Sequence, residues 1–139
     1  MSAAYVDASA LVKLFKAEPE TEAFRMALAD WPVQVASELI RVEAICTARR
    51  LGDEDTLRRA DAALEQITLV PLSPQIIELA TDPYAPPLRA MDAIHLATAL
   101  TMREDLGALF VYDSALHAAA EAHGLNPLAP RRAEPDGAK

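Results

Sequence analysis

Short apolar runs alternate with longer segments of helical periodicity along this chain, and this alternation limits the possible fold more than any other feature. The apolar runs are short and end at turn or capping residues, as buried strands do. They predict four strands, at residues 3–6, 33–35, 67–70 and 109–112. The segments between them predict helices at residues 8–16, 20–29, 37–52, 53–66, 90–104 and 116–123, with a short one opening at 73. This order predicts an α/β fold, a three-layer α/β/α sandwich with a mostly parallel central sheet.

The length and apolar content of the chain correspond to a single domain. With 139 residues, 52% of them hydrophobic, the chain has enough material for one core. We expect the domain to occupy residues 1–129, followed by a polar tail at 130–139. Ser37 is the expected N-cap of the helix at 37–52, and Ser73, followed by Pro74, that of the short helix.

Composition excludes several classes of function. The single cysteine, Cys46, has no partner for an intrachain disulfide or a Cys-based zinc site, so a cytoplasmic protein is expected. The first residues lack a signal-like pattern, and no apolar stretch reaches the roughly 18 residues that span a bilayer, so no membrane association is expected. The net charge of −8 disfavours general attraction to nucleic acid, and any such contact is expected to be local.

Four acidic residues occupy positions where chemistry is expected. Asp7 and Asp113 each directly follow a predicted strand, and open parallel sheets bind ligands beyond the carboxyl ends of their strands. Glu43 lies in an apolar stretch of its helix, and Asp92 stands near the start of the most apolar helix. A buried carboxylate is costly unless it is paired or binds a metal, so both of these acids need a partner.

Each acid considered alone also has a structural explanation. The two aspartates that follow strands suit helix caps, and Arg41 or Arg89 is available as an ion-pair partner for the other two acids. His95, one helical turn after Asp92, is more typical of a packed or supporting group than of a metal ligand. Gathered in one crevice, however, four carboxylates would repel one another unless protons or cations neutralised them.

Carboxylate oxygens in such a group favour Mg²⁺ or Mn²⁺. A metal site of this kind lowers the pKa of a bound water and directs it at a phosphodiester. The four glycines form no phosphate-binding loop, so nucleotide-cofactor chemistry is not expected. The acids therefore predict a divalent-metal-dependent phosphodiesterase.

Four motifs occur in the order and spacing of a known family. They are residues 5–14 (YVDASALVKL), 37–43 (SELIRVE), 92–99 (DAIHLATA) and 112–116 (YDSAL). With these motifs the chain resembles the PIN-domain ribonucleases and, more narrowly, the VapC toxins of bacterial type II toxin–antitoxin pairs. The resemblance extends from about Tyr5 to Leu128, nearly the whole predicted domain.

The resemblance implies a set of roles and partners. Asp7, Glu43, Asp92 and Asp113 would bind Mg²⁺ or Mn²⁺, with Asp7 and Asp92 the firmest ligands, and Ser9 would support the site. The implied activity is endonucleolytic hydrolysis of RNA by metal-activated water. The implied partners are a second copy of the chain and a VapB-type antitoxin that blocks the acidic crevice.

Val111 departs from the family pattern, because many relatives have Thr or Ser two residues before the fourth acid. The lost hydroxyl leaves room for a second hypothesis, a catalytically weak or inactive PIN-like module that binds RNA or protein. A third hypothesis is a receiver-like phospho-acceptor domain. Receivers need paired acids after the first strand, where this chain has Asp7 alone, and a Lys after a late strand, whereas no Lys lies between Lys16 and Lys139.

Overall fold

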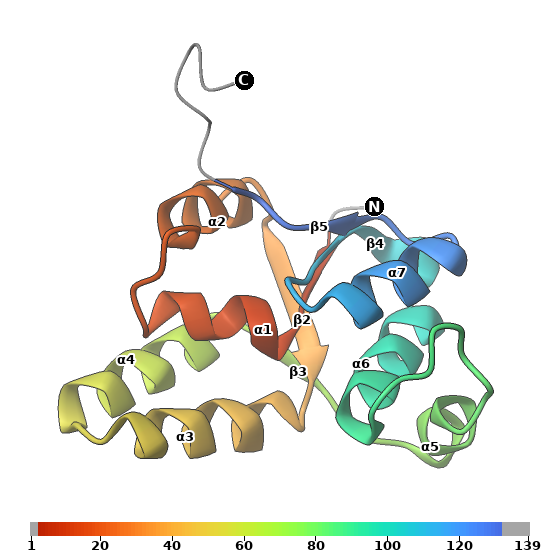
Figure 1. Cartoon of the computed structure of the whole chain (residues 1–139), viewed down its shortest axis with the longest axis horizontal. Coiled ribbons are helices and arrows are strands. Elements are labelled where there is room, and N and C mark those ends of the chain that lie inside the picture. The colour runs from red at the N-terminus through yellow and green to blue at the C-terminus, as the bar shows by residue number, and fades with distance from the viewer. Residues whose placement is uncertain (1–2, 132–139) are drawn as a thin grey trace, which may run out of the picture.

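A five-stranded parallel sheet forms the middle of the computed structural model, which describes residues 3–131. Its strands are β1 (Ala3–Val6), β2 (Val33–Ser37), β3 (Thr68–Val70), β4 (Leu106–Phe110) and β5 (Pro127–Leu128). They lie in the order β3-β2-β1-β4-β5, and each neighbouring pair is parallel. The first strand is therefore central, with β2 on one side and β4 on the other (Figure 1).

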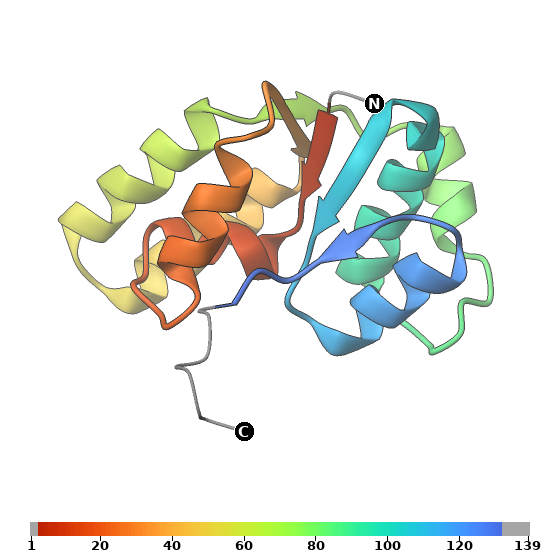
Figure 2. The ribbon, with the colours of Figure 1, turned by 90° about the horizontal axis from the view of Figure 1, so that it is seen from above.

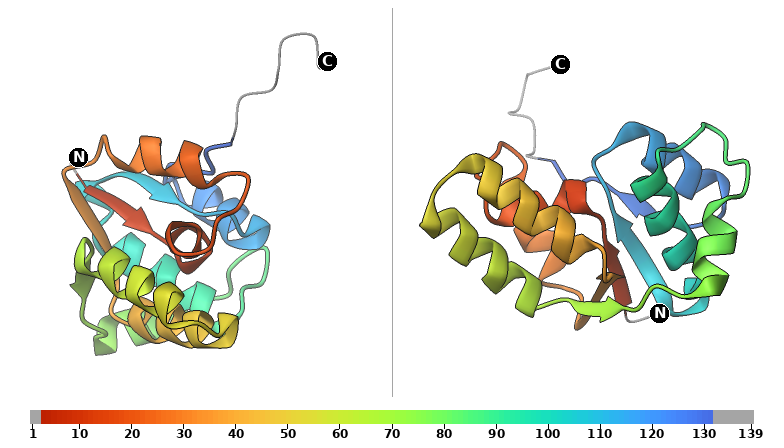
Figure 3. Two further views of the ribbon diagram at one scale, coloured as in Figure 1. Left: turned by 90° about the vertical axis from the view of Figure 1, so that its left-hand side faces the viewer. Right: turned by 90° about the horizontal axis from the view of Figure 1, so that it is seen from below.

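Helices cover both faces of this sheet. They are α1 (Ala8–Leu11), α2 (Thr21–Leu28), α3 (Ile40–Leu51), α4 (Glu54–Glu65), α5 (Pro74–Ala80), α6 (Ala90–Thr101) and α7 (Ser114–Ala122), with single 3₁₀ turns at Val12–Leu14 and Arg103–Asp105. The first four helices lie on one side of the strands and the last three on the other, as seen from above (Figure 2) and from below (Figure 3, right). The predicted three-layer α/β/α sandwich with a parallel sheet is confirmed.

The centre of the core is β1, all four residues of which are buried. A parallel strand covered on both faces is apolar throughout, which explains why residues 3–6 were recognisable from sequence. Phe24 of α2 packs edge to face against Phe110 of β4, with the ring centroids 5.4 Å apart. This contact packs α2 against β4, the neighbour of the central strand.

Two predicted boundaries near the carboxyl ends of the strands are wrong. Ser37 is the last residue of β2 and not the N-cap of the next helix, which begins at Ile40 without a side-chain cap. The strand predicted at 109–112 runs instead from Leu106 to Phe110. After Phe110 the backbone leaves β1, because the amide of Val111 binds Leu128 and the amide of Tyr112 binds the hydroxyl of Ser9.

The remaining expectations concern a cap and the chain end. Ser73 caps α5 as predicted, accepting a hydrogen bond from the amide of Ile76 at 3.1 Å. Most of the tail predicted at 130–139 lies outside the described residues, although the Tyr112 hydroxyl donates to the carbonyl of Pro130. None of the helices in residues 3–131 has the length and apolar character to cross a bilayer.

Candidate active site

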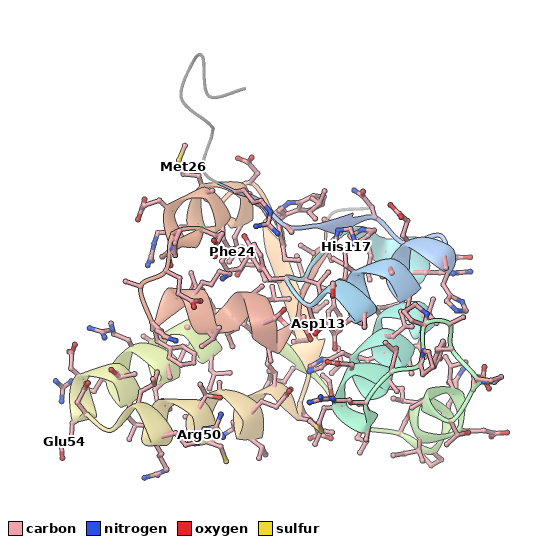
Figure 4. The ribbon with its side chains drawn as sticks, viewed as in Figure 1. Phe24, Met26, Arg50, Glu54, Asp113 and His117 are labelled. Carbon is pink, nitrogen blue, oxygen red and sulfur yellow. The ribbon has the colours of Figure 1, made fainter. Side chains whose placement is uncertain are left out.

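The loops that leave β1 and β4 carry the first and the fourth predicted site acids. Because the two strands are neighbours, their carboxyl ends meet at one edge of the sheet. The amide of Asp7 also donates to the carbonyl of Phe110 at 3.0 Å, which ties the two loops together. Figure 4 shows Asp113 at the start of α7, between α1 and α6 in this view. The expected meeting of the two strand ends is therefore confirmed.

Within residues 3–131, Asp7 accepts hydrogen bonds through one of its two carboxylate oxygens. The residue is 2% exposed, and its Oδ2 accepts hydrogen bonds from the amide of Ser9 at 3.1 Å and from the hydroxyl of Ser9 at 2.6 Å. Ser9 in turn accepts from the amide of Tyr112 at 2.9 Å, so it links Asp7 to the loop after β4. The other oxygen, Oδ1, is buried and has no hydrogen-bond partner among the described residues. A buried carboxylate oxygen that receives no hydrogen bond is costly, so Oδ1 is a candidate ligand for a cation.

Glu43, in the first turn of α3, has His95 of α6 as its partner. His95 is 1% exposed, and its Nε2 lies 2.6 Å from Oε1 of Glu43 and 3.7 Å from Oδ1 of Asp7. Arg41 and Arg89, the partners considered from the sequence, are exposed and form no ion pair within residues 3–131. Burial lowers the pKa of His95, but the hydrogen bond with Glu43 and the charges of nearby acids outweigh burial, and the pKa rises above its usual value.

Asp92 lies in the first turn of α6, half-buried among the other acids. The pKa of Asp92 is raised to about 6, chiefly by burial and then by the negative charges of Asp7 and Asp113, while His95 acts in the opposite direction and Glu43 adds a smaller increase. This shift is evidence that all four predicted acids share one electrostatic neighbourhood, as carboxylates that repel one another do.

Asp113 caps a helix and also belongs to this neighbourhood. Its Oδ2 accepts from the amide of Leu116 at 2.9 Å, in the N-cap arrangement of α7. The capping explanation is thus correct for both strand-end aspartates, since Asp7 caps α1 in the same way. Each cap uses one oxygen and leaves the other for the site. Val111, at the position where many relatives carry a hydroxyl, is fully buried in the core.

One residue of this region was missed from the sequence. The hydroxyl of Tyr5, in β1, lies 2.6 Å from Nδ1 of His95 and accepts a hydrogen bond from the amide of Ser37 at 3.0 Å. A signal was available, because a tyrosine in a wholly buried strand needs a partner for its hydroxyl. What the sequence did not offer was the identity of that partner, which lies 90 residues away.

The donor chemistry of this group fits a hard divalent cation. Within residues 3–131, no three His, Cys, Asp or Glu side chains converge closely enough to enclose an ion as they stand. Mg²⁺ in enzymes is commonly held by one or two carboxylates and keeps several waters, so a complete protein cage is not required. The unpartnered Oδ1 of Asp7 and the raised pKa of Asp92 are both relieved by a positive charge placed between them.

Comparison with known proteins connects this arrangement to a family. The family model described as PIN domain matches residues 4–125. The chain is 37% identical over 130 residues to ribonuclease VapC46 of Mycobacterium tuberculosis, an alignment that covers 94% of this chain and 99% of that protein.

Solved structures with the same fold come from toxins. A toxin–antitoxin complex from Klebsiella pneumoniae matches with a TM-score of 0.70 and 24% identity, over 94% of this chain and 99% of the other. VapC20 of Mycobacterium tuberculosis, described as a sarcin–ricin loop cleaving toxin, matches with a TM-score of 0.68 and 18% identity, over 91% and 99%. At these identities the likeness concerns the fold.

Proposed function

This chain belongs to the PIN-domain family, in its VapC-type branch, and from that membership we propose that it is the ribonuclease toxin of a toxin–antitoxin pair. It cleaves RNA internally by hydrolysis of phosphodiester bonds, with Mg²⁺ or Mn²⁺ at the site cluster, which we define as Asp7, Glu43, Asp92 and Asp113. The observation that supports this proposal most is the buried Oδ1 of Asp7, a carboxylate oxygen that receives no hydrogen bond within the described residues and has His95 only at 3.7 Å.

The residues around the cluster prepare it for this chemistry. Ser9 holds one oxygen of Asp7 and leaves Oδ1 available, while His95 holds one oxygen of Glu43. Asp92, whose pKa burial raises to about 6, retains a proton more readily than an exposed aspartate until a cation displaces that proton. Bound here, a divalent cation supplies charge for the phosphate oxygens and a more acidic water as the nucleophile.

Two arginines support RNA as the substrate of a chain that is acidic as a whole. Arg41 and Arg89 are exposed, and within residues 3–131 neither is engaged in an ion pair. Arg41 precedes Glu43 by two residues and Arg89 precedes Asp92 by three, so both lie near site acids along the chain. Guanidinium groups bind phosphate strongly, and a local pair of them suits a backbone contact.

The partner we propose is a VapB-type antitoxin, with an inserted segment that blocks the acidic cluster. The likeness to the Klebsiella pneumoniae toxin–antitoxin complex over 94% of the chain supports an antitoxin partner. A homodimer is the second assembly that we propose, on the basis of the family alone.

The two alternative functions fare differently. A receiver-like domain would follow the strand order 2-1-3-4-5 of the flavodoxin-like folds, whereas this sheet has the order 3-2-1-4-5. A non-catalytic module that binds RNA remains a distinct hypothesis, favoured only by Val111. Mn²⁺ titration separates it from the nuclease, because a module without catalysis has no need of a cation.

The nuclease is tested by cleavage of structured RNA with purified protein in Mg²⁺ or Mn²⁺. We expect Asp7→Asn and Asp92→Asn to reduce cleavage below detection while the circular dichroism spectrum is unchanged. Asp61→Asn, an exposed position on α4, is the matched control and should cleave like the wild type. Full activity in either site variant, or in the wild type after chelation, would refute the proposed mechanism.

A further inference from the structure

Buried polar groups outside the four acids form a continuous chain of hydrogen bonds that ends on Glu43. The amide of Ser37 donates to Oη of Tyr5 at 3.0 Å, Oη lies 2.6 Å from Nδ1 of His95, and Nε2 of His95 lies 2.6 Å from Oε1 of Glu43. Tyr5 is fully buried and His95 is 1% exposed. The chain connects β2 and β1 in the sheet to α6 on one side and α3 on the other (Figure 1).

The direction of donation along this chain follows from the protons available. Tyr5 accepts from the amide of Ser37, and its own proton has two acceptors, Nδ1 of His95 and the side chain of Thr98. An ionised carboxylate such as that of Glu43 only accepts, so Nε2 of His95, 2.6 Å away, carries a proton whichever group Tyr5 donates to. A neutral histidine whose Nδ1 accepts carries its proton on Nε2. A charged histidine carries a proton on Nε2 as well. In both charge states, therefore, Nε2–H donates to Glu43.

The distances assign this proton to one acid and not to its neighbour. Nε2 of His95 is 2.6 Å from Glu43 but 3.7 Å from Oδ1 of Asp7, and a separation of 3.7 Å is not a hydrogen bond. His95 therefore occupies one oxygen of Glu43 and leaves Oδ1 of Asp7 free.

We propose that His95 is a positioning residue of the active site. Held by Tyr5, it fixes one oxygen of Glu43, so that the second oxygen and Oδ1 of Asp7 stay available to a cation. The effect of His95 on cation binding rests on the proposed function. The hydrogen bond between His95 and Glu43 is present in the structure whether or not a cation binds. Groups that orient metal ligands from behind contribute about 10- to 100-fold to metal affinity or activity.

A purely structural role makes a different prediction. If His95 only fills space between α3 and α6, an apolar residue of similar volume would replace it without effect on the site, because removing both partners of a buried polar contact can be neutral. Leucine and glutamine at this position therefore separate the two roles. Glutamine keeps a donor N–H that reaches Glu43, and leucine does not.

The first experiment measures Mn²⁺ affinity by calorimetry on the full-length chain. We expect His95→Leu to weaken binding by about tenfold and His95→Gln to stay within about threefold of the wild type. His117→Leu is the matched control, since His117 lies on α7 outside the hydrogen-bonded chain (Figure 4), and should bind like the wild type. Wild-type affinity in a folded His95→Leu protein would overturn the proposal.

Tyr5→Phe provides a second variant in case the leucine protein does not fold. It removes only the hydroxyl that holds Nδ1, and we expect Mn²⁺ affinity between those of the wild type and His95→Leu. An unchanged affinity in Tyr5→Phe, with the fold intact, would show that Tyr5 does not hold His95 and would also count against the proposal.

Nuclear magnetic resonance of the metal-free protein tests the contact without any cation. We expect an Nε2 proton of His95 that is protected from exchange in the wild type and loses this protection in Glu43→Ala. Absence of a protected proton in the wild type would refute the positioning role. A wild-type protein that binds no Mn²⁺ but shows the protected proton would instead contradict the metal-dependent function, and the two failures are thus distinguishable.

Discussion

Two groups of carboxylates lie close together in this molecule, and they are neutralised in different ways. The lysine cluster, defined as Lys13, Glu18 and Glu20, contains its own cation: Nζ of Lys13 lies 3.1 Å from Glu18 and 2.7 Å from Glu20. The site cluster has four acids and only the imidazole of His95 among them. Tyr112 lies between the two groups, with its ring 4.3 Å from Nζ of Lys13 and its amide bound to Ser9.

The pKa shifts of the two clusters have opposite signs. The hydrogen bond from Lys13 lowers the pKa of Glu20, whereas burial raises the pKa of Asp92 to about 6. The ionised form is thus favoured at Glu20 and disfavoured at Asp92. A group of acids can therefore be neutralised by a cation of the protein itself or can be a candidate site for a bound cation. The direction of the pKa shift of its acids helps to distinguish the two cases.

The largest expected effect comes from removing the internal cation. Lys13→Met leaves the two glutamates without their partner and loses the contact with Tyr112, so we expect the free energy of unfolding to fall by about 2 kcal/mol, since the part-exposed glutamates regain water. Urea denaturation measures this loss. Lys16→Met is the matched control, since Lys16 is exposed and lies 3.8 Å from Glu18, and we expect a change within about 0.5 kcal/mol. Equal losses of unfolding free energy in the two variants would mean that the ion pairs of Lys13 stabilise the protein no more than the exposed Lys16 does.

The next effect comes from supplying the missing cation. If Mn²⁺ binds the folded site cluster, a concentration ten times its dissociation constant stabilises the protein by about 1.4 kcal/mol. Thermal unfolding with and without Mn²⁺ detects this change as a higher melting temperature. Asp7→Asn should abolish the shift, whereas Lys13→Met should retain it, because its loss lies in the other cluster. A shift of equal size in Asp7→Asn would place the cation elsewhere.

The lysine and site clusters also differ in how far the sequence predicted them. All four acids proposed for the site were selected from local signals, since Asp7 follows an apolar strand and Glu43 interrupts an apolar helix. The pairing of Glu43 with His95 was not found, because residues 52 positions apart meet only through the packing of α3 and α6. The sequence suggested the nearby Arg41 and Arg89 as ion-pair partners instead.

The fold was predictable for a similar reason, and its errors are local. Residues 3–6 form a strand as expected, because a buried parallel strand is apolar on both faces. The end of β4 was misplaced because Val111 and Tyr112 continue the apolar run, although their amides bind Leu128 and Ser9 in place of β1. Hydrophobicity records burial, whereas the end of a strand is set by which backbone groups remain paired, and the sequence does not display that pairing.

A smaller effect is the pH dependence of the site cluster without metal. Because the pKa of Asp92 is raised from 3.8 to about 6, the folded protein binds more protons than the unfolded chain between these values, and stability falls as the pH rises through this window. Asp92 is half-buried and partly screened by solvent, so we expect a loss of about 1 kcal/mol. Unfolding in a chelator at pH 5 and pH 7 measures it. Asp92→Asn should remove this part of the dependence of the free energy of unfolding on pH. An unchanged dependence would show that Asp92 does not cause it.

The smallest effect should have the opposite sign and come from Glu20. Its pKa is lowered from 4.5 by Lys13, so its contribution is present above pH 4.5 and is lost as the pH falls through the lower value in the folded protein. Glu20→Gln should therefore flatten the acid side of the stability profile and leave unchanged the fall in stability that Asp92 causes as the pH rises toward 6. The effect is small because Glu18 still pairs with Lys13 in this variant. If Glu20→Gln and Asp92→Asn changed the profile in the same direction, the two clusters would not be neutralised differently, and the contrast between a finished ion pair and an open site would fail.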